Sequence, residues 1–179
     1  MGKKIYLAAP QVFSRIGETF VREKLQPALQ EAGHDPVYPK DLDDGEIVEI
    51  LGEELGIERA EKLSEWAEEV GSKNAGAIEE ADIVLANLDG ADVDSGTAAE
   101  IGHAYSAGKT IIGYRTDTRS SGENEGVIIN LQVEYFIRES GGAVIAPDSY
   151  GNKWSAEHHK LYSNPDNLID LIKEALEEV

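Results

Sequence analysis

The sequence contains no cysteine, which excludes disulfide bonds, thiolate nucleophiles and cysteine-ligated metal sites. Only four histidines could take over as nitrogen ligands. His158 and His159 are adjacent and cannot share a helix face, while His34 and His103 are isolated in the chain. The sequence therefore predicts structural or surface histidines and no metal site.

Basic residues are few, and long hydrophobic runs are missing. Sixteen Lys and Arg against 35 Asp and Glu give a formal net charge of −19, so the surface repels nucleic acid phosphates and anionic lipid. No apolar run approaches a membrane span, and the residues after Met1 lack the hydrophobic core of a signal peptide. We therefore expect a cytoplasmic protein without nucleic acid or membrane partners, kept soluble by its acidic surface.

The 179 residues suit one domain, and their periodicity predicts an α/β fold. Short apolar runs bounded by turn residues predict strands at 3–9, 35–39, 82–88, 110–115 and 143–147. Segments of helical periodicity alternate with them, at 14–33, 45–70, 73–81, 96–107, 127–139 and 165–178. This alternation is typical of a doubly wound, five-stranded parallel sheet with helices on both faces.

Three local features refine this prediction. Pro27 should bend or break the first helix, because proline lacks a backbone N–H. Asp166 or Asn167 is a candidate cap for the last helix. Residues 40–72 are very acidic and poor in β-branched side chains, which predicts an inserted helical pair, or a lid, within the single domain 1–179.

Ligands of open parallel sheets bind beyond the carboxyl ends of the strands. The segment "NLDGADVDSG" follows the third predicted strand, and it brings Asp92, Asp94 and Glu100 close together among small residues. These acids have structural as well as functional interpretations. Asp92 and Asp94 suit helix capping or a solvated turn, and they equally suit hydrogen bonds to sugar hydroxyls.

Glu100 also allows two interpretations. "TAAE" at 97–100 is a capping box, in which Thr97 caps the helix and Glu100 reaches back to the Thr97 backbone N–H. Alternatively, Glu100 lies in the first helical turn, where the helix dipole keeps it ionised, and its small neighbours leave room for a ligand. An ionised carboxylate in a crevice can attack an anomeric carbon and hold the sugar covalently.

Three segments together resemble the nucleoside 2-deoxyribosyltransferase family: "IYLAAP" at 5–10, "ADIVLANLDGADVDSGTAAEIGHAYSAGKTIIGYRTD" at 81–117 and "NLQVEYFIRESGG" at 130–142. The resemblance covers most of the chain outside 40–72 and 148–164. It implies a flavodoxin-like fold and exchange of the base on a 2'-deoxyribonucleoside through a covalent deoxyribosyl-enzyme. The implied partners are a deoxyribonucleoside and a free nucleobase, with no cofactor.

The resemblance also implies roles for individual residues. Glu100 falls on the nucleophile and Tyr6 on the tyrosine that orients it. Substrate-binding positions implied by the resemblance, or placed around the predicted crevice, are Ala8, Asn74, Asp92, Asp94, Ser95, Gly96, Asn130 and Gln132. Asn130 and Gln132 fall in a segment that, in the family, reaches the active site of a neighbouring subunit, which implies a homo-oligomer of at least two chains.

Two residues depart from the family pattern. Asn74 stands where members usually carry a base-contacting aspartate, and an amide hydrogen-bonds a base but donates no acidic proton. Gln132 replaces a frequent methionine. By residue type alone, Tyr6 also suits a buried core position and Asn130 a helix cap. Two other activities remain open: hydrolysis of 2'-deoxynucleoside 5'-monophosphates, with Ser95 near the phosphate, and non-catalytic nucleotide binding.

Overall fold

The computed structural model describes residues 2–43, 45–117, 129–146 and 164–179. Five parallel strands form one sheet in the order β2-β1-β3-β4-β5. Their bounds are β1 (Lys4–Ala8), β2 (Asp35–Val37), β3 (Ile83–Asn87), β4 (Thr110–Tyr114) and β5 (Val144–Ile145). The predicted doubly wound α/β fold is confirmed, and each described strand lies within its predicted segment.

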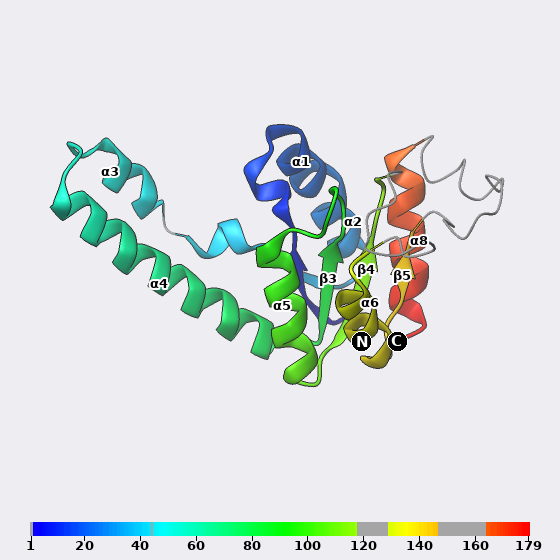
Figure 1. Cartoon of the computed structure of the whole chain (residues 1–179). Helices are drawn as coiled ribbons and strands as arrows, with labels where there is room; N and C mark the ends of the chain where they lie inside the picture. Colours follow the sequence, from blue (N-terminus) through cyan, green and yellow to red (C-terminus); the bar gives the residue numbers. More distant parts are fainter. Residues whose placement is uncertain (1, 44, 118–128, 147–163) are drawn as a thin grey trace.

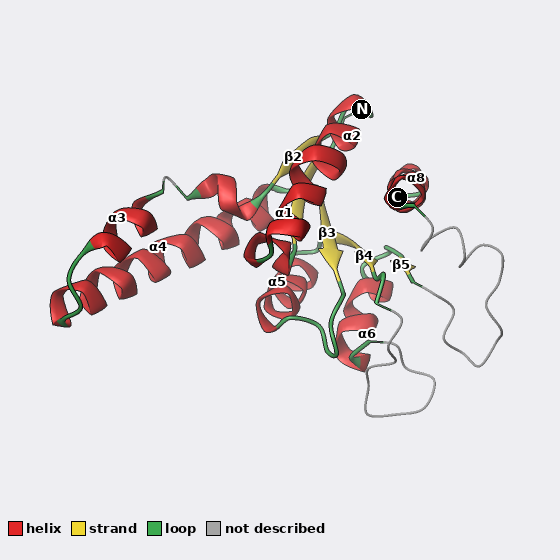
Figure 2. Cartoon of the chain, turned by 90° about the horizontal axis from the view of Figure 1, so that it is seen from above, coloured by secondary structure: helices red, strands yellow, loops and turns green. Residues whose placement is uncertain are grey.

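Helices cover both faces of the sheet, as Figure 2 shows from above. Their bounds are α1 (Arg15–Phe20), α2 (Gln26–Glu31), α3 (Glu46–Gly52), α4 (Ile57–Glu80), α5 (Ser95–Ser106), α6 (Leu131–Glu139) and α8 (Pro165–Glu177). Alternate residues of each strand enter two separate cores. Ile5 and Leu7 pack with α2 and α8, whereas Tyr6 and Ala8 pack on the side of α4, α5 and α6.

The first helical segment is not broken at Pro27. α1 continues through a π-helical stretch, Val21–Leu25, directly into α2, where Pro27 occupies the first turn. A wider turn at this point accommodates the missing N–H of Pro27, so the helical segment continues. The predicted cap of α8 is wrong: Asn164 holds this position, its Oδ1 accepting from the Asp166 N–H at 3.0 Å, and Pro165 begins the helix.

The acidic segment forms two helices, and the break between them lies at 53–56 rather than at 71–72, where the predicted helices 45–70 and 73–81 place it. The chain turns at 53–56, and α4 then runs through Gly71 and Ser72 without interruption to Glu80. Figure 1 shows α3 and most of α4 extending away from the sheet, while the end of α4 returns to it through buried Ala77 and Ile78. Ile47 at the start of α3 and residues of α4 from Trp66 onward nevertheless line a cavity at the strand ends.

Candidate active site

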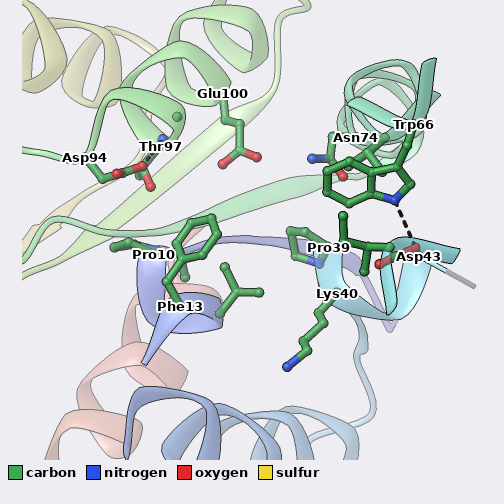
Figure 3. Close-up of a pocket in the computed structure, with 15 residues that line it drawn as sticks. Pro10, Phe13, Pro39, Lys40, Asp43, Trp66, Asn74, Asp94, Thr97 and Glu100 are labelled. Carbon is green, nitrogen blue, oxygen red and sulfur yellow. Dashed lines mark hydrogen bonds between the residues drawn. The ribbon is translucent and has the colours of Figure 1, made fainter. Parts of the chain in front are cut away.

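A cavity of about 430 Å³ lies beyond the carboxyl ends of β1 and β3, where the strand order reverses. The turn after β1 supplies one wall, the segment after β2 and the near part of α4 supply another, and the start of α5 supplies the third (Figure 3). Four of the predicted site residues line this cavity: Asn74, Asp94, Gly96 and Glu100.

Glu100 is partly buried and faces the cavity (Figure 3). Its Oε1 accepts a hydrogen bond from the Tyr6 hydroxyl at 2.6 Å, across 94 residues of sequence. Tyr6 is fully buried in β1, so this contact comes from beneath the cavity floor. Within the described residues no hydrogen bond reaches Oε2, which leaves one carboxyl oxygen of Glu100 available to a ligand.

The pKa of Glu100 is raised to about 7: burial is the largest cause, the Tyr6 hydrogen bond lowers the pKa in part, and the nearby Asp94 charge adds to the rise. The pKa of Tyr6 is raised by burial and by the Glu100 charge, so the phenol stays a hydrogen-bond donor. The prediction that the helix dipole keeps Glu100 ionised is wrong. α5 begins at Ser95, so Glu100 lies in its second turn and desolvation dominates.

The capping-box interpretation of Glu100 is also wrong. Asp94 is the N-cap of α5, and its Oδ2 accepts from the Thr97 N–H at 3.1 Å. The Glu100 side chain bonds to Tyr6 rather than to its own helix. A Cβ at Gly96 would lie 3.1 Å from Asp94 Oδ2, so the glycine keeps space open beside that carboxylate. Asp94 and Glu100 therefore project from one helix start into one cavity.

Three predicted residues near the cavity do not line it. Ala8 is fully buried in β1, and its neighbour Ala9 takes the place at the cavity wall. Asp92 is exposed, and its Oδ1 accepts from the Val93 N–H at 2.8 Å in a local turn. Ser95 is the first, exposed residue of α5. Their assignment to the substrate stays a prediction.

Asn130 and Gln132 lie away from the cavity. Asn130 is the N-cap of α6, and its Oδ1 accepts from the backbone N–H groups of Gln132 and Val133 at 3.0 and 3.3 Å. The Gln132 side chain is exposed. Neither residue lines this chain's own pocket. Their predicted role in a neighbouring subunit's site stays a prediction.

The cavity also has a wall that the sequence interpretation missed. Asp43 and Lys40, from the segment after β2, and Trp66 of α4 line it together with Asn74, and Phe13 lies across the cavity in the turn after β1 (Figure 3). Phe13 lies in the segment 6–13 at the end of the first predicted strand. Its position could have indicated a role in the site, because ligands bind beyond the ends of parallel strands. Trp66 carried no comparable signal, since it lies eight residues before Asn74 in an exposed acidic helix.

No group of three or more His, Cys, Asp or Glu side chains suited to a metal ion occurs in the part of the chain that the structure describes. In the same residues, no helix has the length and hydropathy needed to cross a bilayer.

The family model described as nucleoside 2-deoxyribosyltransferase matches residues 5–132. The matched segment holds β1 from Ile5 onward, all of β2, β3 and β4, and every residue that lines the cavity. The chain belongs to the nucleoside 2-deoxyribosyltransferase family. Members bind nucleosides and nucleobases, and the chain is accordingly an enzyme that transfers a glycosyl group or cleaves a glycosidic bond. No curated protein matches the sequence.

Solved structures share this fold. A 2-deoxyribosyltransferase from Bacillus psychrosaccharolyticus is 28% identical, with 84% of this chain and 92% of that chain covered and a TM-score of 0.51. A conserved protein from Enterococcus faecalis V583 is 19% identical over 97% and 99%, with a TM-score of 0.59. A CMP N-glycosidase from Clostridium botulinum is 17% identical over 96% and 99%, with a TM-score of 0.54. The last two similarities concern the fold alone.

Proposed function

We propose that the chain transfers the 2-deoxyribosyl group between nucleobases through a covalent bond to Glu100. The observation that carries the proposal is the Glu100 carboxyl group itself. It faces a cavity of nucleoside size, one oxygen is held by Tyr6, and the pKa of about 7 lets it ionise near neutral pH. A buried carboxylate with one free oxygen is suited to nucleophilic attack on an anomeric carbon.

The reaction proceeds in two displacements. Glu100 Oε2 bonds to C1' as the C1'–N bond breaks, the bonding electron pair leaves with the base, and the departing base takes up a proton from solvent. A ring nitrogen of the second base then attacks C1', the C1'–O bond breaks, and its electron pair returns to Glu100 while the ring N–H proton passes to solvent. Two inversions retain the configuration at C1'. Asp94 accepts hydrogen bonds from sugar hydroxyls, and Tyr6 keeps Glu100 in position.

The charges around the cavity favour a nucleoside over a nucleotide. Asp43, Asp94 and Glu100 line it, whereas Lys40 is the one cationic side chain among the residues described as lining it. The Lys40 ammonium already bonds to Glu18 at 2.8 Å. A phosphate would therefore meet three carboxyl groups and a cation that is already paired. Hydrolysis of a 5'-monophosphate remains the alternative outcome.

The decisive experiment is base exchange. With deoxyinosine and free adenine, we expect deoxyadenosine and hypoxanthine to accumulate in equal amounts, because the sugar passes from one base to the other. Liquid chromatography separates all four compounds. Free deoxyribose, or release of base only from a 5'-monophosphate, would establish the hydrolase instead. An unchanged nucleoside that nevertheless binds would indicate a sensing module.

We also propose a homo-oligomer in which α6 lies at a subunit contact. Leu131 and Tyr135 of α6 are 51% and 50% exposed, and Tyr135 extends an aromatic cluster with Tyr105 and Phe136. This apolar surface begins beside Asn130, which is predicted to contact a substrate bound in the active site of a neighbouring subunit. Shared sites would thus follow from packing of this face on a second copy.

Light scattering after size exclusion is expected to give at least twice the 19.4 kDa of one chain. Leu131→Glu should shift the mass toward that of one chain, since it places a charge in the contact. The new acid would occupy the first turn of α6, where the helix dipole favours it, so the folded subunit should persist. A monomeric wild-type chain with full base exchange would contradict the shared site.

A further inference from the structure

The wall of the cavity formed by the segment after β2 and by α4 is chemically distinct from the wall formed by α5. It presents the Asp43 carboxylate, the Trp66 indole and the Asn74 amide, and in Figure 3 these lie to one side of Glu100 while Asp94 lies to the other. If Asp94 binds the sugar, as in the proposed function, the base points toward Asp43 and Asn74.

Asp43 is held in a defined orientation. Its Oδ1 accepts from the Trp66 indole N–H at 3.3 Å and from the Gly45 backbone N–H at 3.2 Å. The other oxygen, Oδ2, receives no hydrogen bond within the described residues, and in Figure 3 it points back toward Pro39 and the cavity. The indole donor is thus already used, and a carboxylate oxygen remains as an acceptor for a ligand.

Asn74 offers a complementary group. Its Oδ1 is buried and has no hydrogen-bond partner among the residues that the structure describes. This oxygen is closed to solvent, so the group that Asn74 offers a ligand is its Nδ2 amide, which in Figure 3 lies on the side of Glu100. An asparagine N–H donates to the unprotonated ring nitrogen beside an exocyclic amino group, and an aspartate accepts from the amino group itself.

We propose that Asp43 and Asn74 select nucleobases that carry an exocyclic amino group beside a ring nitrogen, namely 6-aminopurines and 4-aminopyrimidines, over the corresponding oxo bases. This inference rests on the proposed function for the direction in which the base points. An oxo base presents a carbonyl oxygen where the amino group would be. The oxo base turns this oxygen toward the Asp43 carboxylate and a ring N–H toward the Asn74 N–H, so it loses both contacts and adds repulsion.

The test compares substrates that differ at this one position. Wild-type kcat/KM should be at least about tenfold higher for deoxyadenosine than for deoxyinosine, and for deoxycytidine than for deoxyuridine, because a site built to bond a donor rejects the analogue without it. Asp43→Asn should reduce both preferences below about threefold, since a carboxamide can donate to a carbonyl as well as accept from an amine.

Asp41→Asn is the matched control. Asp41 lies two residues earlier, in the short helical turn Pro39–Leu42 that ends just before Asp43; it is outside the cavity and bonds to Arg22 at 2.7 Å. It should leave the preference unchanged. Trp66→Phe keeps an aromatic ring and removes the N–H that orients Asp43, so it should weaken the preference as well and serves if Asp43→Asn fails to fold.

Binding without turnover separates this inference from the proposed function. In the Glu100→Gln variant, calorimetry should show tighter binding of free adenine than of hypoxanthine, by about tenfold. If wild type turns over no nucleoside, the proposed function fails, and the ratio of the two dissociation constants still decides the inference. Equal affinity for the two bases, or an unchanged preference in Asp43→Asn, would overturn it.

Discussion

Glu100→Gln is expected to abolish base exchange and at the same time to make the folded chain more stable above pH 7. The loss of kcat should be about 10⁴-fold or more, because the amide cannot form the bond to C1'. The amide oxygen still accepts from the Tyr6 hydroxyl, so the local structure should persist. Exchange assays and thermal or urea unfolding measure the two effects.

The gain in stability follows from the pKa of Glu100. Folding raises this pKa from 4.5 to about 7, so burial favours the protonated carboxyl. The stability that this group contributes is complete below pH 4.5 and is lost as the pH rises through 7. Glutamine does not titrate, so the difference between variant and wild type should grow between pH 5 and pH 8 to at most about 3 kcal/mol.

Glu79→Gln provides the control for this pair of effects. Glu79 is an exposed carboxylate near the end of α4, 3.6 Å from His103 and outside the cavity. Its replacement should change neither exchange nor the pH dependence of unfolding by a comparable amount. Retained activity in Glu100→Gln together with a loss of stability would restore a structural role for Glu100 and would remove the proposed mechanism.

The pH profile of base exchange should report the titration of Glu100 as well. The nucleophile must be ionised, and Glu100 has a pKa of about 7, so kcat/KM should rise about tenfold per pH unit below 7 and level off above it. At pH 5 the rate should be about 100-fold below its plateau. Initial rates from pH 5 to 9, on a donor stable over that range, measure the midpoint.

Tyr6→Phe tests the cause of this midpoint. The Tyr6 hydroxyl stabilises the ionised form of Glu100, so its removal should move the midpoint upward, by about one pH unit for a hydrogen bond to a charged group. Phenylalanine fills the same buried space, which keeps the effect specific. A wild-type midpoint near 4.5, or a downward shift in the variant, would show that Glu100 is not the buried, Tyr6-bound nucleophile.

The elements that local patterns predict well are those with strong, short-range signals. The five strands were found as short apolar runs, because a strand buried on both faces is apolar at nearly every position. Breaks in the helices were predicted less well. Gly71 and Ser72 suggested a break in α4 that does not occur, since a single glycine costs only about 1 kcal/mol and neighbouring helical residues compensate.

The chain itself determined the fold class, the family and the identity of Glu100 as a candidate nucleophile, because apolar periodicity and the order of residues around 91–110 are properties of contiguous sequence. Tertiary structure alone excluded the capping-box interpretation of Glu100. Its bond to Tyr6, its raised pKa and the cavity wall with Asp43 and Trp66 all depend on segments far apart in the chain. Burial and hydrogen bonding between such segments arise only when the sheet brings the strand ends together.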